Sequence, residues 1–372
     1  MIDTPAADTA LPSRASPSLR REPFTFTGTT REYFGIWIVN ILLTILTVGI
    51  YSAWAKVRRQ RYFYGNTWLA GANFEYHARP VQILIGRLIV IGLIIAYNVA
   101  LQFYPLVGGL IGIAFLFMIP WFVSRGLRFN ARVTSYRNVR FDFAGGYGGG
   151  FLAFLLGGAL VYGSAGILAP LASQWMWNYS LGNLKYGGRP IRCEPRLEKL
   201  YGQWWLPALV LVSGMILLFV VIVALVVVFA DSLGPLVGFD EGSAEPSPYL
   251  ILLGVYVVLI PFFLLYALAG LLYRAGTRNV ALNETVIDGR HLLSSQIHRG
   301  RYAGIAITNL LATLFSLGLL RPWAAIRMAK YMATVTALDA TSSLEEYFGE
   351  IQQEGAAIGS EYMDMEGFDV GF

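Results

Sequence analysis

Two matched pairs of tryptophan and arginine are the residues of this chain best suited to chemistry. Trp54 is followed four residues later by Arg58, and Trp323 by Arg327, each just after an apolar stretch. The planar guanidinium of arginine binds phosphate and carboxylate groups through two parallel hydrogen bonds. One hypothesis is that both pairs contact the headgroups of anionic membrane lipids. The alternative is that they only anchor the chain at the membrane surface, where tryptophan and positive charge are favoured.

Three further polar residues lie inside apolar stretches. Asn40 and Asn309 end the matching segments YFGIWIVN and YAGIAITN. Their amides either hydrogen-bond between helices or line a polar path through the membrane. Arg321 is a charged residue that is energetically costly to bury in the membrane if its segment enters only halfway. If the segment crosses completely, the side chain can extend to the outer surface.

The other chemically active residue types do not form a recognisable site. The three histidines, His77, His291 and His298, lack partners at metal-ligand spacing. The glycine-rich run 145–150 lacks the Lys-Ser/Thr of a phosphate loop, so close helix packing is the better explanation. No nucleophile has an activating base nearby in sequence, and the basic residues adjoin apolar segments rather than a nucleic-acid motif. We therefore expect no enzyme activity, metal, cofactor or nucleic-acid partner.

The candidate residues belong to an internally repeated segment. Its copies are 33–64, 147–180 and 302–331, and the middle copy is degenerate and lacks the arginine. Each copy is predicted to be a helical hairpin, with its turn at Gly49, Gly166 or Gly318. Repeats of this kind build symmetric membrane proteins.

Composition and hydropathy predict a membrane protein. The chain is 56% hydrophobic and only 14% charged. Four apolar stretches, 81–103, 106–124, 204–230 and 249–273, approach or exceed the ~20 residues needed to cross a bilayer. The predicted fold is thus an all-α polytopic membrane protein with four full transmembrane helices and three repeated helical hairpins.

The distribution of basic residues decides between two topologies. If each repeat crossed the membrane once, the basic segments 56–79 and 125–140 would lie opposite 185–199 and 274–301. If each repeat is a hairpin, all four segments lie on one side, as the positive-inside rule requires. This favours hairpins, with both termini cytoplasmic.

The segments outside the helices have predicted roles as well. Alternating apolar residues in the basic segments, such as Val139 to Phe143, predict short cytoplasmic β-hairpins. Residues 1–22 are expected to be a disordered cytoplasmic tail, 23–340 the membrane domain, and 341–372 an acidic cytoplasmic tail. Leu344, Phe348 and Ile351 have helical spacing, so this last tail is expected to begin with a short amphipathic helix.

The first repeat carries a family resemblance. The run FTFTGTTREYFGIWIVNILLTILTVGIYSAWAKVRRQRYFYGNTWLAGANFEYH is similar to the YjgN family (DUF898) of bacterial inner-membrane proteins, most specifically from Thr47 through Gly71. The resemblance covers residues 24 to about 340. It implies a multi-pass protein of the bacterial cytoplasmic membrane, and it supplies no activity, substrate or catalytic residue.

Two functional classes remain open on the sequence. One is a transporter-like or lipid-handling protein whose hairpins line a path for anionic amphiphiles. The other is a non-transporting scaffold that binds a protein partner through its cytoplasmic β-hairpins and tails. A polar cavity lined by Asn40, Asn309 or Arg321 would favour the first class, and a packed interior the second.

Overall fold

Helices make up most of the chain. The computed structural model describes residues 20–228, 248–341, 343–351 and 353. The helices are α1 (Thr30–Leu46), α2 (Ser52–Gly65), α3 (Pro80–Phe103), α4 (Pro105–Arg132), α5 (Tyr147–Gly150), the π-helix η1 (Phe151–Leu156), α6 (Gly157–Gly163), α7 (Ala169–Gly182), α8 (Leu197–Val228), α10 (Pro248–Asn283), α11 (Arg299–Phe315) and α12 (Arg321–Thr334).

Eleven strands form one antiparallel sheet. They are β1 (Arg20–Pro23), β2 (Thr25–Phe26), β3 (Thr67–Leu69), β4 (Ala72–Tyr76), β5 (Thr134–Tyr136), β6 (Val139–Phe143), β7 (Leu184–Tyr186), β8 (Arg189–Cys193), β9 (Thr285–Ile287), β10 (His291–Ser295) and β11 (Thr336–Ala340). Their order is β1-β11-β10-β9-β8-β7-β6-β5-β4-β3-β2. The two edge strands, β1 and β2, are separated only by Phe24, so the sheet is nearly closed on itself.

The prediction of an all-α fold is therefore wrong. The tight β-turns are local, and both central residues of Ala70–Gly71, Arg137–Asn138, Gly187–Gly188 and Asp288–Gly289 have positive φ, as in type I′ turns. The pairings across the helices are not local. For example, β4 pairs with β5 only after the chain has passed through α3 and α4. Strands of two to five residues carry too little pattern to predict such long-range partners.

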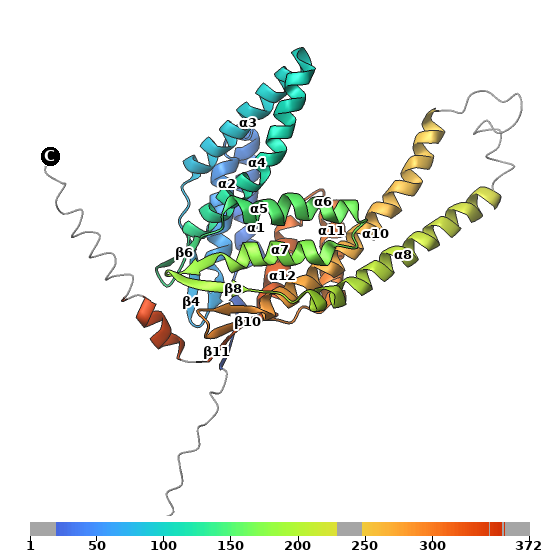
Figure 1. Cartoon of the computed structure of the whole chain (residues 1–372). Helices are drawn as coiled ribbons and strands as arrows, with labels where there is room; N and C mark the ends of the chain where they lie inside the picture. The colour runs from blue at the N-terminus through green and yellow to red at the C-terminus, as the bar shows by residue number, and fades with distance from the viewer. Residues whose placement is uncertain (1–19, 229–247, 342, 352, 354–372) are drawn as a thin grey trace, which may run out of the picture.

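Five helix pairs rise from this sheet (Figure 1). Within the described residues, each pair leaves the sheet from one strand and returns through the strand beside it: β2–β3, β4–β5, β6–β7, β8–β9 and β10–β11. Helix α12 of the last pair packs against α1 of the first, and β1 pairs with β11. The helices therefore follow the same nearly closed ring as the strands.

Two of the five pairs are long and apolar. Helices α3, α4, α8 and α10 contain 24 to 36 residues. At about 1.5 Å per residue they exceed the ~30 Å of a bilayer core. They hold the four candidate membrane spans, of mean hydropathy 2.2 to 3.1, and at most 11% of each span is buried. In Figure 1 the pairs α3–α4 and α8–α10 diverge from the sheet as two separate arms.

The three short pairs share one turn geometry. They are α1–α2, the segment from α5 to α6 with α7, and α11–α12. Positive φ occurs at Val48–Gly49, Ala165–Gly166 and Leu317–Gly318. In each turn the glycine N–H donates to the carbonyl five residues earlier, as in a Schellman motif. The structure thus places Gly49, Gly166 and Gly318 at turns between helices.

The turns of the short helix pairs contact neighbouring helices. The Arg87 guanidinium in α3 donates to Ser52 Oγ beside the first turn. Trp204 Nε1 in α8 donates to Gly166 O of the second turn, at 2.9 Å. Arg321, which follows the third turn, lies close enough to Tyr33 for its charge to act on the Tyr33 hydroxyl. The contacts of the first two tips fall about two helical turns into α3 and α8, well short of their far ends.

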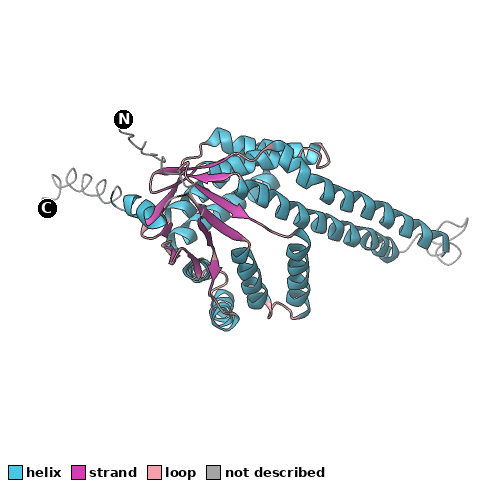
Figure 2. Cartoon of the chain, turned by 90° about the horizontal axis from the view of Figure 1, so that it is seen from below, coloured by secondary structure: helices cyan, strands magenta, loops and turns pink. Residues whose placement is uncertain are grey.

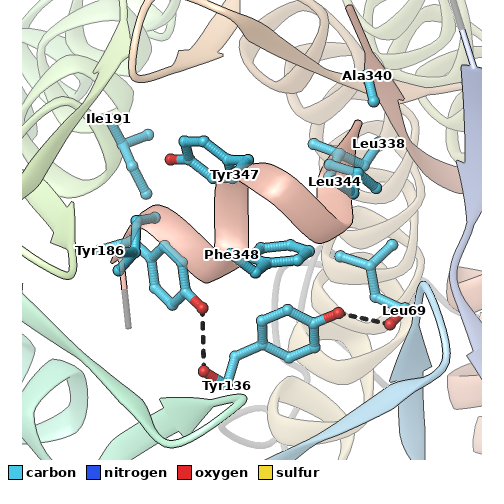
Figure 3. Close-up of a cluster of buried hydrophobic side chains, with 10 residues drawn as sticks. Leu69, Tyr136, Tyr186, Ile191, Leu338, Ala340, Leu344, Tyr347 and Phe348 are labelled. Atoms are coloured by element: carbon cyan, nitrogen blue, oxygen red, sulfur yellow. Dashed lines mark hydrogen bonds between the residues drawn. The ribbon is translucent and has the colours of Figure 1, made fainter. Parts of the chain in front are cut away.

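The inner face of the sheet holds a hydrophobic core (Figure 3). A short helix over 344–351 buries Leu344, Tyr347, Phe348 and Ile351 among side chains of β3, β5, β7, β8 and β11. The Tyr186 hydroxyl donates to Tyr136 O at 3.0 Å beneath it. The start of the acidic tail is therefore folded, and 354–372 lies outside the described residues. At the other end, residues 20–22, expected in the disordered tail, belong to β1, whereas 1–19 are outside the description.

Figure 2 shows the strands gathered at one end of the molecule, with the helices extending away from them. The five helix pairs are thus held at their bases by a common sheet. Side chains at the ends of the helices next to the sheet are therefore close enough to contribute to one site.

Candidate functional site

Arg327 is held in a defined position between α11 and α12. Its Nη1 donates to Thr308 Oγ1 at 2.7 Å and to Asn309 Oδ1 at 3.2 Å. Its guanidinium carbon lies 5.1 Å from the centre of the Trp323 ring, a cation–π contact. Three residues that the sequence assigned to two separate sites, Asn309, Trp323 and Arg327, therefore form one cluster.

The buried amide of Asn309 joins the two helices. Its Nδ2 donates to Ala324 O on α12 at 3.0 Å, while its Oδ1 accepts from Arg327. An amide placed in this way links the helices and orients the arginine at the same time. Asn309 thus makes the interhelical hydrogen bond that was one of its two predicted roles.

The cluster borders an open groove with a volume of about 600 Å³. Three cationic side chains line it, those of Arg301, Arg327 and Lys330, and no carboxylate of the described residues does. The remaining lining residues are Gly304, Ile305, Thr308, Tyr331 and Thr334. Tyr331 is fixed by a hydrogen bond from its hydroxyl to His298 O, at 3.3 Å. The guanidinium of Arg301 lies 5.5 Å from the Tyr331 ring. The groove is therefore strongly positive.

The equivalent place in the first helix pair is built differently. Glu32 stands where the third pair has Arg301, and Val39 stands where it has Thr308. The Tyr62 hydroxyl, the counterpart of Tyr331, donates to the Glu32 carboxylate at 3.1 Å. A carboxylate at this position repels an anionic ligand.

The first Trp–Arg pair is correspondingly unconstrained. Arg58 is exposed and makes no hydrogen bond, ion pair or ring contact with any residue that the structure describes. Trp54 stacks on Tyr51, with ring centres 6.2 Å apart. Asn40 is buried, and its Oδ1 has no hydrogen-bond partner among the described residues. Trp54 and Arg58 thus lack the surroundings that orient Trp323 and Arg327.

In the structure, the three residues of the predicted polar path, Asn40, Asn309 and Arg321, do not contact one another through hydrogen bonds between described residues. Arg321 is exposed beside the third turn and lies toward Tyr33 of the first pair. These three residues occupy three different surroundings.

Sequence reasoning missed two polar residues of the groove, namely Arg301 and Thr308. Helical spacing was a usable signal, because Arg301 and Thr308 are seven residues apart and Arg327 and Lys330 three apart, each pair on one helix face. What no spacing within a single helix shows is that the two faces meet. The turn at Gly318 and the Asn309 amide bring them together.

Comparisons with known proteins agree on a family. The family model described as "Bacterial protein of unknown function (DUF898)" matches residues 21–365. "Inner membrane protein YjgN" of Escherichia coli strain K12 is 36% identical over 121 residues, and the protein of that name from Salmonella typhimurium is 37% identical over 122 residues. Each match spans 32% of this chain and 30% of the relative, less than a third of either protein. No solved structure shows a significant match.

Proposed function

The chain belongs to the DUF898 family of bacterial proteins, and on that premise we propose that this membrane protein binds phosphate groups of anionic phospholipids in the groove between α11 and α12. The observation that carries the proposal is a groove that, in the described part of the chain, is lined by three cations and no carboxylate. Anionic lipid headgroups bind in basic pockets between membrane helices on the cytoplasmic side.

The donor geometry of Arg327 suits a phosphate. Its hydrogen bonds to the described residues use only Nη1, so Nε and Nη2 have no partner among those residues and remain available to a ligand. Thr308, Asn309 and Trp323 hold the guanidinium in place before a ligand arrives, which lowers the entropy cost of binding. Lys330 and Arg301 add charge on either side.

The proposed depth of the groove follows from helix lengths. Helices α2, α7 and α12 have 14 residues, about 21 Å, which is less than a bilayer core. The tip residues Val48 and Leu317 are 93% and 94% exposed, so they require lipid around them. We therefore place the short pairs as re-entrant elements beside four crossing helices.

This placement puts the groove at headgroup level. Its residues lie toward the sheet ends of α11 and α12. From the positive-inside rule we expect the sheet and both termini to lie in the cytoplasm. In that arrangement Arg321 stays on the cytoplasmic half of the membrane, near the base of α1, and does not need to reach the outer surface.

The test is native mass spectrometry of the purified protein in mild detergent. Arg327→Lys keeps the charge but loses the planar fork, so we expect at least about tenfold weaker retention of anionic lipid. Arg58→Lys, at the equivalent but unconstrained position, is the matched control and should retain lipid normally. Equal retention by wild type and Arg327→Lys would overturn the proposal.

A second probe separates two sources of the same chemistry. Inorganic phosphate alone, titrated into delipidated protein, tests whether the groove takes a free phosphate rather than a headgroup. Arg327-dependent binding of phosphate without lipid retention would replace the lipid in the proposal by a soluble anion.

The scaffold function is the second candidate, and one observation favours it. The sheet already holds an amphipathic short helix, 344–351, on its inner face, so this surface accommodates a helix.

Movement of lipid between the two leaflets would be the transporter form of the main proposal. Reconstitution into liposomes with a lipid-flip assay separates binding from movement.

A further inference from the structure

We infer that α4 carries a second phosphate-binding site, formed by Trp121, Arg125 and Arg128 against the start of α5. The site lies in a different helix pair from the Arg327 groove and shares no residue with it. Its ligand class is a phosphate group, carried by a lipid or free.

The position of this site repeats the geometry around Arg327. In α12, Trp323 and Arg327 lie twelve and eight residues before the C-cap residue Val335. In α4, Trp121 and Arg125 lie twelve and eight residues before the C-cap residue Val133. The motif Trp-x-x-x-Arg therefore occurs at the same height above the sheet in both helices, as it also does in α2, where Trp54 and Arg58 precede the C-cap residue Asn66 by twelve and eight residues. The height alone does not make a site, and what distinguishes Arg125 from Arg58 is the pocket beside it.

The side chains are arranged alike as well. The guanidinium carbon of Arg125 lies 5.3 Å from the Trp121 ring centre, compared with 5.1 Å for Arg327 and Trp323. Arg125 is not engaged in any hydrogen bond or ion pair with the described residues. Its donors are therefore available to a ligand.

A small pocket lies beside Arg125. Its volume is about 120 Å³, on the order of four water molecules, which suits a single phosphate group. It is lined by Trp121, Ser124, Arg125, Arg128, Gly145, Gly146 and Tyr147. No carboxylate is among them, and the nearby Asp142 is paired with Arg132 at 2.9 Å. The positive charge of Arg125 is thus uncompensated within the pocket.

The pocket walls are held by specific contacts. Arg128 Nε donates to Phe143 O and its Nη2 to Gly145 O, both at 3.2 Å, which ties α4 to the segment before α5. A Cβ on Gly150 would lie 2.9 Å from Ser124 Oγ, so the glycine allows the helix to approach α4 closely. The glycine-rich run therefore acts by close packing and helps to shape one wall of the pocket.

The experiment compares bound-lipid number in single and double variants. In native mass spectra of protein extracted with anionic phospholipid, we expect wild type to retain two tightly bound lipids, and Arg125→Gln and Arg327→Lys one each. The double variant should retain none. Arg125→Lys, which keeps charge but not the fork, should weaken the second lipid at least about tenfold.

The outcomes separate this inference from the proposed function, although both concern phosphate. If Arg327→Lys loses a lipid and both Arg125 variants keep the wild-type number, the inference is overturned and the proposed function stands. If only the Arg125 variants lose a lipid, the reverse holds. Arg58→Lys controls for a general effect of arginine replacement, and gel filtration controls for folding.

Inorganic phosphate distinguishes the source of the ligand. Phosphate binding by delipidated protein that is lost in Arg125→Gln assigns the pocket to a free phosphate. Arg125-dependent lipid retention without phosphate binding assigns it to a headgroup. Absence of any Arg125-dependent binding of either probe overturns the site.

Discussion

The first and third helix pairs have nearly the same framework, but they carry opposite charges at one position, Glu32 in the first pair and Arg301 in the third. Both have the Schellman turn, the buried asparagine, the Trp–Arg pair and the tyrosine that bonds the backbone at the start of the pair. The third has Arg301 and Thr308 where the first has Glu32 and Val39. Two residues outside the shared motif thus give the third pair a cation and a hydroxyl beside Tyr331 and Arg327, whereas the first pair has a carboxylate that accepts from Tyr62.

The different surroundings of Arg327 and Arg58 indicate that the Trp–Arg motif alone does not make a binding site. At Arg327 the motif is completed by residues from the partner helix, and at Arg58 it is not. Arg58 fits the simpler role of an interfacial anchor, because it meets no ligand-like surroundings among the described residues. Under the proposed function, the same motif would serve topology in the first helix pair and binding in the third.

The largest effect is expected from exchanging the distinguishing charge. Arg301→Glu gives the third pair the carboxylate of the first and should weaken retention of anionic lipid by at least about a hundredfold, because it replaces attraction by repulsion at the lipid phosphate. Native mass spectrometry checks the change. The control is Glu345→Arg, a charge change of equal size on an exposed residue, which should leave retention unaltered.

The reverse exchange sharpens the same comparison. Glu32→Arg combined with Val39→Thr gives the first pair the groove residues of the third. We expect it to add one retained anionic lipid that Arg58→Lys then removes. If Arg301→Glu has no effect and this double variant gains nothing, the electrostatic contrast between the pairs does not govern binding.

A smaller effect is expected from the two asparagines. Asn309→Leu removes the hydrogen bonds to Ala324 O and Arg327 and should cost about 1–3 kcal/mol of unfolding free energy. Asn40→Leu removes a buried oxygen that has no partner in the described structure, so it should be neutral or slightly stabilising. Denaturation of both variants in detergent measures the difference. Equal losses of stability would show that the asparagines have equivalent roles.

The smallest effect concerns His291, which is fully buried on β10. Its counterpart by repeat spacing is Glu22, which lies on β1. The His291 ring centre lies 4.5 Å from that of Tyr347, and neither ring nitrogen has a hydrogen-bond partner in the described chain. Burial, with the nearby Arg290, lowers the pKa of His291, and Asp288 partly opposes this. Arg189 and Glu350 also face this contact.

The sign of the pH dependence follows from the lowered pKa. The docked helix 344–351 favours neutral His291, because the pKa of His291 is lowered in the folded protein. The contribution of neutral His291 to the stability of the docked helix is therefore complete above the ordinary histidine pKa of about 6.5. This contribution falls as the pH drops below that value. Hydrogen exchange of 344–351 between pH 8 and pH 5.5 should show faster exchange at the acidic end after correction for the intrinsic rate. His291→Leu should remove this dependence. A pH response that persists in His291→Leu would assign it to other groups, such as Glu350.

The membrane character and the helix-pair turns were accessible from the sequence, because both are local properties. Four spans follow from runs of apolar residues, and three turns follow from Gly49, Gly166 and Gly318, whose φ is positive in the structure. The helical spacing of Leu344, Phe348 and Ile351 likewise predicted a helix that the structure contains. Each of these signals lies within about twenty consecutive residues.

Tertiary structure alone decided the sheet and the sites. The pairing of β4 with β5 joins residues about sixty positions apart, and strands of three and five residues carry no signal that selects each other over such a distance. The Arg327 groove likewise needs Arg301 and Thr308 from another helix. A charge cluster is a property of distances in space, and only the packing of α11 against α12 sets those distances.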